Sequence, residues 1–471
     1  MSHSGPLPLA QRAARVRFRR ALALVAMTLV LPGSAQLVAG NRRVGRVAVW
    51  ASIVLASATV ATAITSYFWH ELALWIATTP TVLLVLRLAL LVLGLAWAAL
   101  FVDAFRLGEP LTLGVGHRRT TLLVNCGLAL TVAGALLFGS HVVNTQRGMI
   151  MALFTGTKES AAVDGRYNVL LIGADSGVTR WGMRTDSMTL ASIDATTGRT
   201  VLIGLPRNME NFPFQHGSVL AKQFPHGYNC STCELNSLST YASDHPTLFK
   251  DAKYPGIDAT IEGIEGITDL KVNYWAMIDL QGFRDLADAV GGVTINVRQP
   301  IAIGKTGDVV GWIQPGVQRL SGDKLLWYAR SRATSDDYSR MARQKCVMSA
   351  MLHQLSPTTV LQHFDALATA SKGVLETSIP PSDVDTFVTL AMKAKSQKVA
   401  TLSLVPPLVD TMHPDIAKIR AAIARSLAGK PATGKHRSRP AQVTTQMTEG
   451  SYGSMQTGYT ANDTTNLAAA C

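Results

Sequence analysis

Three long apolar runs near the N-terminus constrain the architecture of this chain more than any other feature. They cover residues 47–68, 81–102 and 120–141, and each is close to the roughly 20 residues that a helix needs to cross a bilayer. We therefore expect residues 21–143 to form a membrane region with three transmembrane helices, followed by a separate folded portion.

A shorter apolar run precedes these spans and is interrupted by Pro32 and Gly33. It is too short for an ordinary crossing, so we interpret residues 21–40 as a re-entrant or interfacial hairpin. The basic N-terminus at residues 1–20 and the arginines of residues 42–46 then both lie in the cytoplasm, as the positive-inside rule favours. A fourth crossing is the alternative, and it would place one arginine cluster outside.

Charge also orients the later segments. Residues 106–119 carry arginine and are predicted to be cytoplasmic, whereas residues 66–79 carry no Lys or Arg and are predicted to lie outside. Everything after about residue 144 is then extracytoplasmic, in a multi-pass protein of the plasma membrane. Many arginines behind the formal charge of +13 flank the apolar spans, so this charge does not indicate nucleic-acid binding.

Strands and helices alternate after a linker at residues 144–165. This alternation predicts an α/β domain over residues 166–405, with a mixed central sheet flanked by helices on both faces. Residues 406–428 are expected to contain a terminal helix. Residues 429–471 hold few large apolar side chains, so we predict a disordered tail.

Charged side chains mark the ends of three predicted strands. Residues 166–174 form a continuous apolar run typical of a buried strand, and Asp175 follows it. Arg184 and Asp186 open a second strand, and Arg207 follows a third. We expect these charged groups to contribute to one site.

The segment at residues 328–344 is the strongest candidate for an anion-binding element. Asp336 and Asp337 can cap a helix that begins near Tyr338. The candidate anion ligands are Arg330, Arg332, Arg340, Arg343 and Gln344. The last three are spaced i, i+3 and i+4, so they share a helix face near its positive N-terminus. A solvated basic helix start with ion pairs to the two aspartates is the alternative.

Converging arginines need compensation by anions. At about 7 Å and an effective dielectric constant near 20, each pair of like charges costs roughly 2 kcal/mol. A pyrophosphate group would supply the missing negative charge, and a divalent ion held by two carboxylates could bridge its oxygens. A purely structural network of ion pairs remains open as another interpretation.

The five cysteines suggest one local disulfide. Cys230 and Cys233 form a CxxC motif without further ligands at zinc spacing and without a thioredoxin-like context. Outside the membrane, a disulfide between them is the expected state. Cys126, Cys346 and Cys471 are predicted to be unpaired.

Several motifs within residues 166–356 carry a family resemblance. They read NVLLIGADS, RTDSM, LIGLPRN, LSGDKLLWYARSR and DYSRMARQ. In these motifs the chain resembles the LytR-CpsA-Psr family of bacterial cell-envelope glycopolymer ligases. The resemblance implies an α/β/α fold with a hydrophobic groove for a polyprenyl chain. It also implies transfer of a glycopolymer, with its linking phosphate, from a polyprenyl pyrophosphate carrier to peptidoglycan.

The same resemblance implies roles for individual residues. Asp175 and Asp186 would hold Mg²⁺, and Asp337 would orient or activate groups near the acceptor. The implied catalytic residues are Asp337, Arg332 and Arg340. The implied pyrophosphate ligands are Arg184, Arg207, Arg330, Arg332, Arg340 and Gln344, with Arg343 beside them. Asn208 stands where the family commonly has Asp, which leaves the role of that position open.

Two other functions remain open from the sequence. One is a non-catalytic envelope regulator of the transcriptional-attenuator type, and the other is hydrolysis of the polyprenyl pyrophosphate if water replaces the acceptor. The expected partners are a polyprenyl-linked glycan, peptidoglycan and the lipid bilayer. Nucleic acid is not expected, because the folded domain is predicted to lie outside the membrane.

Overall fold

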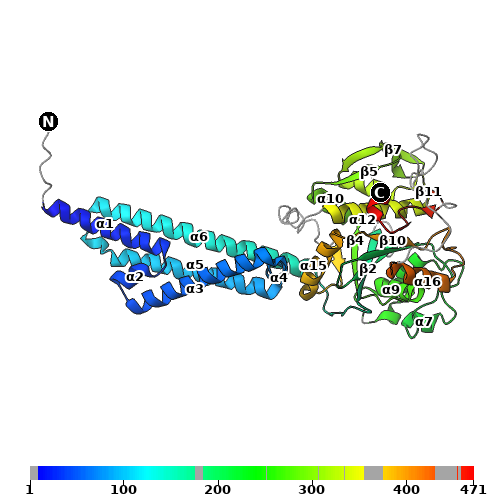
Figure 1. Ribbon diagram of the computed structural model, residues 1–471, viewed down its shortest axis with the longest axis horizontal. Helices are drawn as coiled ribbons and strands as arrows, with labels where there is room; N and C mark the ends of the chain where they lie inside the picture. Colours follow the sequence, from blue (N-terminus) through cyan, green and yellow to red (C-terminus); the bar gives the residue numbers. More distant parts are fainter. Residues whose placement is uncertain are drawn as a thin grey trace. The chain divides into compact units, whose positions relative to one another are not determined.

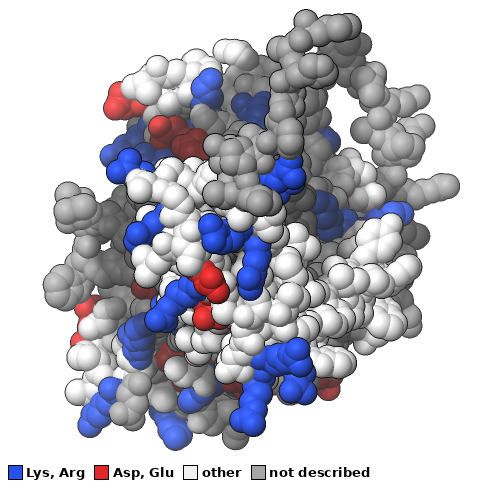
Figure 2. Space-filling view, turned by 90° about the vertical axis from the view of Figure 1, so that its left-hand side faces the viewer, with Lys and Arg blue, Asp and Glu red and all other residues white. Residues whose placement is uncertain are grey.

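The chain consists of two compact units, Met1–Met151 and Ala152–Cys471 (Figure 1). The computed structural model describes residues 9–175, 184–250, 252–305, 307–333, 335–354, 375–429, 453–454 and 458–471. Basic side chains are more abundant than acidic ones on the face shown in Figure 2, in keeping with the formal charge of +13.

The first unit is built from helices. They are α1 (Leu9–Val30), α2 (Ser34–Ala39), α3 (Arg42–Phe68), α4 (His70–Thr78), α5 (Pro80–Leu107), the short η1 (Pro110–Thr112) and α6 (Val115–Leu153). Three segments are long and apolar enough to cross a membrane, Arg42–Phe68, Pro80–Thr112 and Val115–Leu153. This finding agrees with the three spans predicted from the sequence.

Apolar side chains cover the outside of these three helices. Val60, Leu95 and Leu130 have exposed fractions of 57%, 68% and 74%. Such surfaces suit contact with lipid, because exposure of continuous apolar area to water is unfavourable. The helical unit therefore has the surface of a membrane anchor.

The segment predicted as a hairpin is helical on both sides of a turn. Gly33 occupies a left-handed conformation with φ of 94° between α1 and α2. The indole of Trp97 donates to the carbonyl of Thr28 at 3.0 Å, and the amide of Gln36 donates to the carbonyl of Leu100 at 3.0 Å. Both helices thus pack on α5, whereas their depth in a membrane stays a prediction.

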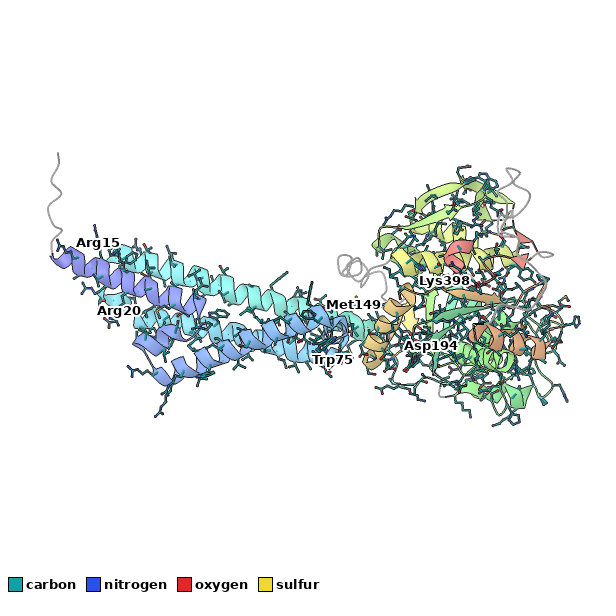
Figure 3. All side chains as sticks on the ribbon, in the orientation of Figure 1. Arg15, Arg20, Trp75, Met149, Asp194 and Lys398 are labelled. Carbon is teal, nitrogen blue, oxygen red and sulfur yellow. A yellow bond between two sulfur atoms is a disulfide. The ribbon has the colours of Figure 1, made fainter. Side chains whose placement is uncertain are left out.

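The two ends of the helical unit differ in charge. Arg15 and Arg20 lie at one end, and Trp75 and Met149 lie at the other (Figure 3). The connection between α3 and α5 contains no Lys or Arg. This separation is the pattern on which the predicted orientation rests.

The second unit contains a mixed seven-stranded sheet in the order β13-β10-β3-β2-β1-β4-β9. Its strands are β1 (Arg166–Asp175), β2 (Arg184–Asp194), β3 (Thr200–Leu205), β4 (Tyr274–Asp279), β9 (Leu375–Thr377), β10 (Ala400–Ser403) and β13 (Asp463–Thr464). The pairs β1–β4 and β3–β10 are parallel, and the other neighbours are antiparallel. This arrangement confirms the predicted mixed sheet.

Helices cover both faces of this sheet, because its strands alternate apolar side chains between two cores. Leu170 and Ile172 pack in one core, beneath α7 (Val219–Gln223), α8 (Leu238–Asp244), α9 (Pro255–Thr268) and α16 (Ile416–Leu427). Leu171 and Leu202 face the other side, which carries α12 (Asp337–Gln354). The α/β/α fold is therefore confirmed.

Further elements complete the second unit. They are α10 (Leu280–Ala289), α11 (Gly322–Arg330), α15 (Val384–Lys395), α17 (Leu467–Ala470), the paired strands β5 (Val293–Val297) with β8 (Gly316–Leu320), β6 (Ile301–Lys305) with β7 (Asp308–Ile313), and β11 (Gly453–Ser454) with β12 (Gly458–Tyr459). Short 3-10 turns cover Leu235–Ser237, Pro246–Phe249 and Pro381–Asp383. Strands β5, β6 and β8 enclose a third apolar core with α11.

The C-terminal residues contradict the prediction of a disordered tail. Residues 458–471 pack on the domain: β13 pairs with β10, and a disulfide joins Cys346 to Cys471. The prediction that these two cysteines are unpaired is therefore wrong. The amino-acid composition led to the wrong prediction because this segment is held by backbone pairing with β10 and by a disulfide across 125 residues, and not by a large apolar core of its own. Residues 430–452 of the predicted tail lie outside the described residues.

The other cysteines behave as the sequence suggested. Cys230 and Cys233 form a disulfide. Cys126 is a free, exposed cysteine on α6.

Candidate functional site

A cavity of about 550 Å³ lies between the sheet and the helices α10, α11 and α12. Strands β1, β2 and β4 form its floor. Much of its wall is apolar, including Leu171, Ile278, Phe283, Leu326 and Met351. Its size lies within the roughly 300–1,000 Å³ that is usual for pockets that take small molecules.

The polar part of the cavity wall gathers most of the residues that the sequence singled out. They are Asp186, Arg207, Arg330, Arg332, Arg340 and Gln344, together with Ser187. The backbone of Asp175 and Arg184 ends two paired strands, β1 and β2, and the two residues lie opposite each other in the register. The side chains of these two residues lie outside the part of the chain that the structure describes.

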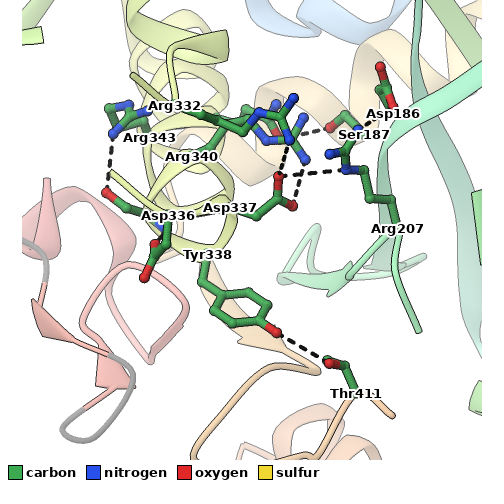
Figure 4. A network of polar contacts seen from close by, with 12 residues as sticks. Asp186, Ser187, Arg207, Arg332, Asp336, Asp337, Tyr338, Arg340, Arg343 and Thr411 are labelled. Carbon is green, nitrogen blue, oxygen red and sulfur yellow. Dashed lines mark hydrogen bonds and ion pairs between the residues drawn. The ribbon is translucent and has the colours of Figure 1, made fainter. Parts of the chain in front are cut away.

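The start of α12 brings the first aspartates into place. The carboxylate of Asp336 accepts a hydrogen bond from the backbone amide of Ser339 at 2.7 Å, which is the N-cap contact predicted from the sequence. Asp337 follows as the first residue of the helix. Asp337 and Arg340 are one turn apart, so their side chains meet on the same face, at 2.9 Å (Figure 4).

The carboxylate of Asp337 is the centre of an ion-pair network (Figure 4). Besides Arg340, it lies 3.6 Å from the guanidinium of Arg207 and 3.5 Å from that of Arg332. Arg207 also contacts Asp186 at 2.7 Å. These three arginines share two carboxylates, and Arg330 adds a fourth cation to the cavity wall. The described part of the site therefore keeps an excess of positive charge.

Arg340 is more deeply buried than Arg207 and Arg332. Arg340 has a side-chain exposure of 7%, and its Nε atom is buried without a hydrogen-bond partner within the described residues. Burial lowers the pKa of Arg340, an effect that Asp337 opposes and Arg207 reinforces. Arg340 also lines the cavity, so an anion bound there would compensate its buried positive charge.

Arg207 is held more firmly in its charged form. Burial works against its charge, but Asp337 and Asp186 outweigh burial and raise the pKa of Arg207. The next residue, Asn208, has a buried Oδ1 atom with no hydrogen-bond partner in the described residues. Asn208 is not among the residues that line the cavity.

Arg343 does not reach the cavity, contrary to its inclusion among the expected ligands. Its side chain is fully buried, and it donates to the carbonyls of Tyr328 and Ser331 and to the hydroxyls of Ser335 and Ser339. These contacts tie α12 to the end of α11 and to the loop that carries Arg332. Arg343 is therefore a structural residue of α12 that holds the connection between α11 and α12 in place.

Two contacts extend the site beyond the residues found from the sequence. The hydroxyl of Ser187 donates to the side-chain oxygen of Gln344 at 2.9 Å, which links β2 to α12. The hydroxyls of Tyr338 and Thr411 lie 3.2 Å apart, within hydrogen-bond distance (Figure 4). Ser187 follows Asp186 in the RTDSM motif, so that motif contained the signal for it, whereas no local pattern connects Tyr338 with Thr411.

Comparison with known proteins identifies the family. A model of the LytR_cpsA_psr family matches residues 140–414, which is more than half of the chain. The chain belongs to the LytR-CpsA-Psr family. This result confirms the resemblance that the sequence motifs carry.

Individual relatives in the LytR-CpsA-Psr family match part of their length. The chain is 25% identical over 279 residues to Biofilm regulatory protein A of Streptococcus mutans, which covers 56% of this chain and 64% of that protein. It is 27% identical over 155 residues to the polyisoprenyl-teichoic acid–peptidoglycan teichoic acid transferase TagV of Bacillus subtilis, which covers 32% and 39%. The chain thus spans less than two thirds of the length of either relative.

The solved structure of B. subtilis TagV is also similar to this LytR-CpsA-Psr chain. The two are 20% identical with a TM-score of 0.41, over 56% of this chain and 98% of the TagV chain. A protein from Streptococcus agalactiae is 21% identical with a TM-score of 0.43, over 56% and 88% of the two chains.

The magnesium ion implied for the LytR-CpsA-Psr family can be tested against the residues present. Among the described residues, no three His, Cys, Asp or Glu side chains gather as a metal site. Mg²⁺ commonly binds through one or two carboxylates plus substrate phosphates and water, so a larger protein cluster is not required. Asp186 lines the cavity, and the β1–β2 register places Asp175 at the same end of the neighbouring strand. The donor set therefore fits Mg²⁺.

Proposed function

We propose that this protein is a membrane-anchored phosphotransferase that moves a glycopolymer from a polyprenyl pyrophosphate carrier to peptidoglycan. One observation carries the proposal: a largely apolar cavity of about 550 Å³ whose wall also holds Arg207, Arg330, Arg332 and Arg340. A polyprenyl pyrophosphate combines the same two properties, a long apolar chain and a polyanionic head. The name of TagV, a teichoic acid transferase that acts between a polyisoprenyl carrier and peptidoglycan, supports this choice.

In this proposal the arginines bind and orient the pyrophosphate. Arg340 offers a buried guanidinium group and Arg207 a partly buried one, and the more exposed Arg332 approaches from the loop before α12. Charge-assisted hydrogen bonds from such groups are shorter and stronger than neutral ones. They would stabilise the charge that grows on the departing polyprenyl phosphate.

Transfer breaks one phosphate–oxygen bond of the carrier. A hydroxyl group of peptidoglycan loses its proton as its oxygen attacks the phosphorus that bears the glycan, and polyprenyl phosphate departs with the bridging oxygen. Asp337 holds the three guanidinium groups in position for this step, because each of them contacts its carboxylate. When bound by Asp175 and Asp186, Mg²⁺ would add positive charge beside the phosphates.

The apolar wall would hold the carrier chain and exclude water from the phosphates. Phe283, Leu326 and Met351 come from three different helices and leave a space lined by carbon. Burial of a prenyl chain is favourable by about 25 cal/mol for each Å² of apolar surface removed from water. The chain thus contributes affinity, while the arginines set the position of the reacting phosphates.

We also propose the orientation in the membrane. The arginine-bearing end of the helical unit lies in the cytoplasm, and the α/β domain lies outside the cell. This placement supports the proposed reaction, because peptidoglycan is outside the plasma membrane.

A reconstituted transfer reaction tests this function. The full chain in lipid nanodiscs is incubated with polyprenyl pyrophosphate-linked N-acetylglucosamine, Mg²⁺ and peptidoglycan, and sugar attached to peptidoglycan is measured. We expect transfer by the wild-type protein and its loss in Arg332→Ala and Asp186→Ala. Full activity of both variants would overturn the assignment. Release of the sugar without its attachment to peptidoglycan would instead indicate a hydrolase.

A further inference from the structure

The C-terminal segment, residues 458–471, lies beyond the part of the chain that the family model matches, which ends at residue 414. It nevertheless packs directly behind α12, the helix that carries Asp337 and Arg340 (Figure 1). Its strand β13 extends the central sheet, and its last residue is bonded to Cys346 of α12. A segment outside the shared domain therefore supports a helix of the candidate site.

Asn462 is the polar centre of this contact. Its side chain is buried, and its Nδ2 atom donates to the backbone carbonyl of Tyr338 at 2.9 Å. Its Oδ1 atom accepts from the ammonium of Lys345 at 2.8 Å and from the hydroxyl of Ser403 at 3.1 Å. Its backbone carbonyl accepts from the amide of Ser403 at 2.7 Å. Asn462 thus joins α12 to strand β10, with its side chain contacting both elements and its backbone contacting β10.

The two contacts on α12 lie in its first turns. Tyr338 stands between Asp337 and Arg340 in the chain (Figure 4), and Lys345 follows it about two turns later. With about 100° per residue in an α-helix, Lys345 lies about 140° around the helix from Arg340. Asn462 therefore contacts α12 on the side away from the cavity, while Arg340 faces the cavity.

The buried amine of Lys345 depends on this contact for a hydrogen-bond partner. It is fully buried, and its ammonium also donates to the hydroxyl of Ser403. Burial lowers the pKa of Lys345 to about 7, and Asp463 opposes the effect. A buried amine needs hydrogen-bond partners, and Asn462 supplies one of them.

From these contacts we infer that Asn462 is a positioning residue, which sets the placement of Arg340 and Asp337 by fixing the first turns of α12 from behind. The inference rests on the proposed function, because it assigns Asn462 a part in binding the carrier pyrophosphate. Small displacements matter at such a site, since misplacement of a binding group by about 1 Å can cost on the order of 100-fold in rate.

Two substitutions separate positioning from simple structural support. Asn462→Ala removes both side-chain contacts. Asn462→Asp keeps an acceptor for Lys345 and Ser403 but has no N–H for the carbonyl of Tyr338, and its charge can pair with the buried ammonium. Asn462→Asp should therefore keep much of the thermal stability while it disturbs the first turn of α12.

Asn466→Ala is the matched control. Asn466 belongs to the same segment and caps the short helix α17 by accepting from the amide of Ala469 at 3.4 Å. No hydrogen bond of its side chain to α12 is found in the described residues. The substitution is chemically the same as Asn462→Ala, but it does not touch the helix of the site.

The experiment compares binding of geranylgeranyl pyrophosphate and geranylgeraniol to the full chain in nanodiscs. The ratio of the two dissociation constants measures what the charged end of the site contributes. We expect a strong preference for the pyrophosphate in the wild type and in Asn466→Ala. The preference should fall at least about tenfold in Asn462→Ala and in Asn462→Asp, with a melting temperature in Asn462→Asp close to that of the wild type.

The possible outcomes distinguish a failure of this inference from a failure of the proposed function. If the wild type shows no preference for the pyrophosphate, the proposed function fails. If the wild type shows the preference and Asn462→Asp keeps it, Asn462 has no positioning role. A loss of preference that follows the melting temperature equally in all three variants also overturns the inference, because that pattern reflects stability alone.

Discussion

Replacement of Arg340 by methionine should weaken binding of a lipid pyrophosphate while the domain stays folded. One terminal nitrogen of Arg340 already contacts Asp337 at 2.9 Å, and the buried Nε atom has no partner within the described residues. Arg340 also lines the cavity, and its guanidinium carries further N–H groups besides the one directed at Asp337, so at least one charge-assisted hydrogen bond is available to a ligand there. Such bonds contribute about 1.5–3 kcal/mol each, so the dissociation constant should rise by roughly 10- to 150-fold.

The same change should cost little stability. Methionine is similar in length, removes the desolvation cost of a buried guanidinium and leaves Asp337 with Arg207 and Arg332 as partners. Titration of the full chain in nanodiscs with geranylgeranyl pyrophosphate measures the affinity, and thermal unfolding measures stability. Arg420→Met, at an ion pair of 3.9 Å with Asp269 outside the cavity, is the control.

The reasoning about Arg340 has a clear point of failure. If Arg340→Met binds geranylgeranyl pyrophosphate as tightly as the wild type and Arg420→Met, the buried guanidinium does not contact the phosphates. If both variants lose affinity for geranylgeraniol as well, the effect concerns the apolar cavity and not its charge.

Three further predictions follow from the surroundings of α12. Serine substitution of both Cys346 and Cys471 should lower the melting temperature, because closure of a loop of 125 residues is worth about 5 kcal/mol in the chain-entropy model; an unchanged melting temperature would contradict the bond. Arg343→Lys should destabilise the domain and weaken pyrophosphate binding together, since lysine cannot reproduce contacts to two carbonyls and two hydroxyls. Thermal unfolding followed by scanning calorimetry measures the stability, and weaker binding with an unchanged melting temperature would contradict this structural role. Lys345, whose pKa is lowered by burial to about 7, binds fewer protons when folded than when unfolded, so its contribution to stability should rise between about pH 7 and pH 10. Urea unfolding should show a smaller rise in Lys345→Met, and an equal rise in both proteins would refute the assignment.

Local patterns in the sequence were sufficient for much of the fold. The apolar runs of the helical unit and of β1 are continuous, so hydrophobicity alone indicated both the membrane-length helices and the buried strand. The cap at Asp336 also depends only on neighbouring residues, because its carboxylate reaches an amide three positions later. The arginines that line the cavity were recognisable as candidate anion ligands, because charged residues follow or open the predicted strands and the start of the predicted helix.

Other features depend on contacts between distant residues. Arg343 has the spacing of a cavity ligand, but its guanidinium is held by the carbonyl of Tyr328 at the end of α11 and by that of Ser331 just after it. Helical spacing specifies the face of a residue but not what packs against it. The bond between Cys346 and Cys471 likewise depends on the return of the chain to α12, which no local pattern in the C-terminal segment indicates.

The linkage formed in the reaction is the most direct test of the proposed transfer. Peptidoglycan from the reconstituted reaction is digested, and mass spectrometry determines how the sugar is attached, while the released lipid is analysed separately. We predict a sugar joined to peptidoglycan through one phosphate, together with polyprenyl monophosphate. A sugar attached without phosphate, together with intact polyprenyl pyrophosphate, would contradict phosphotransfer at this arginine site.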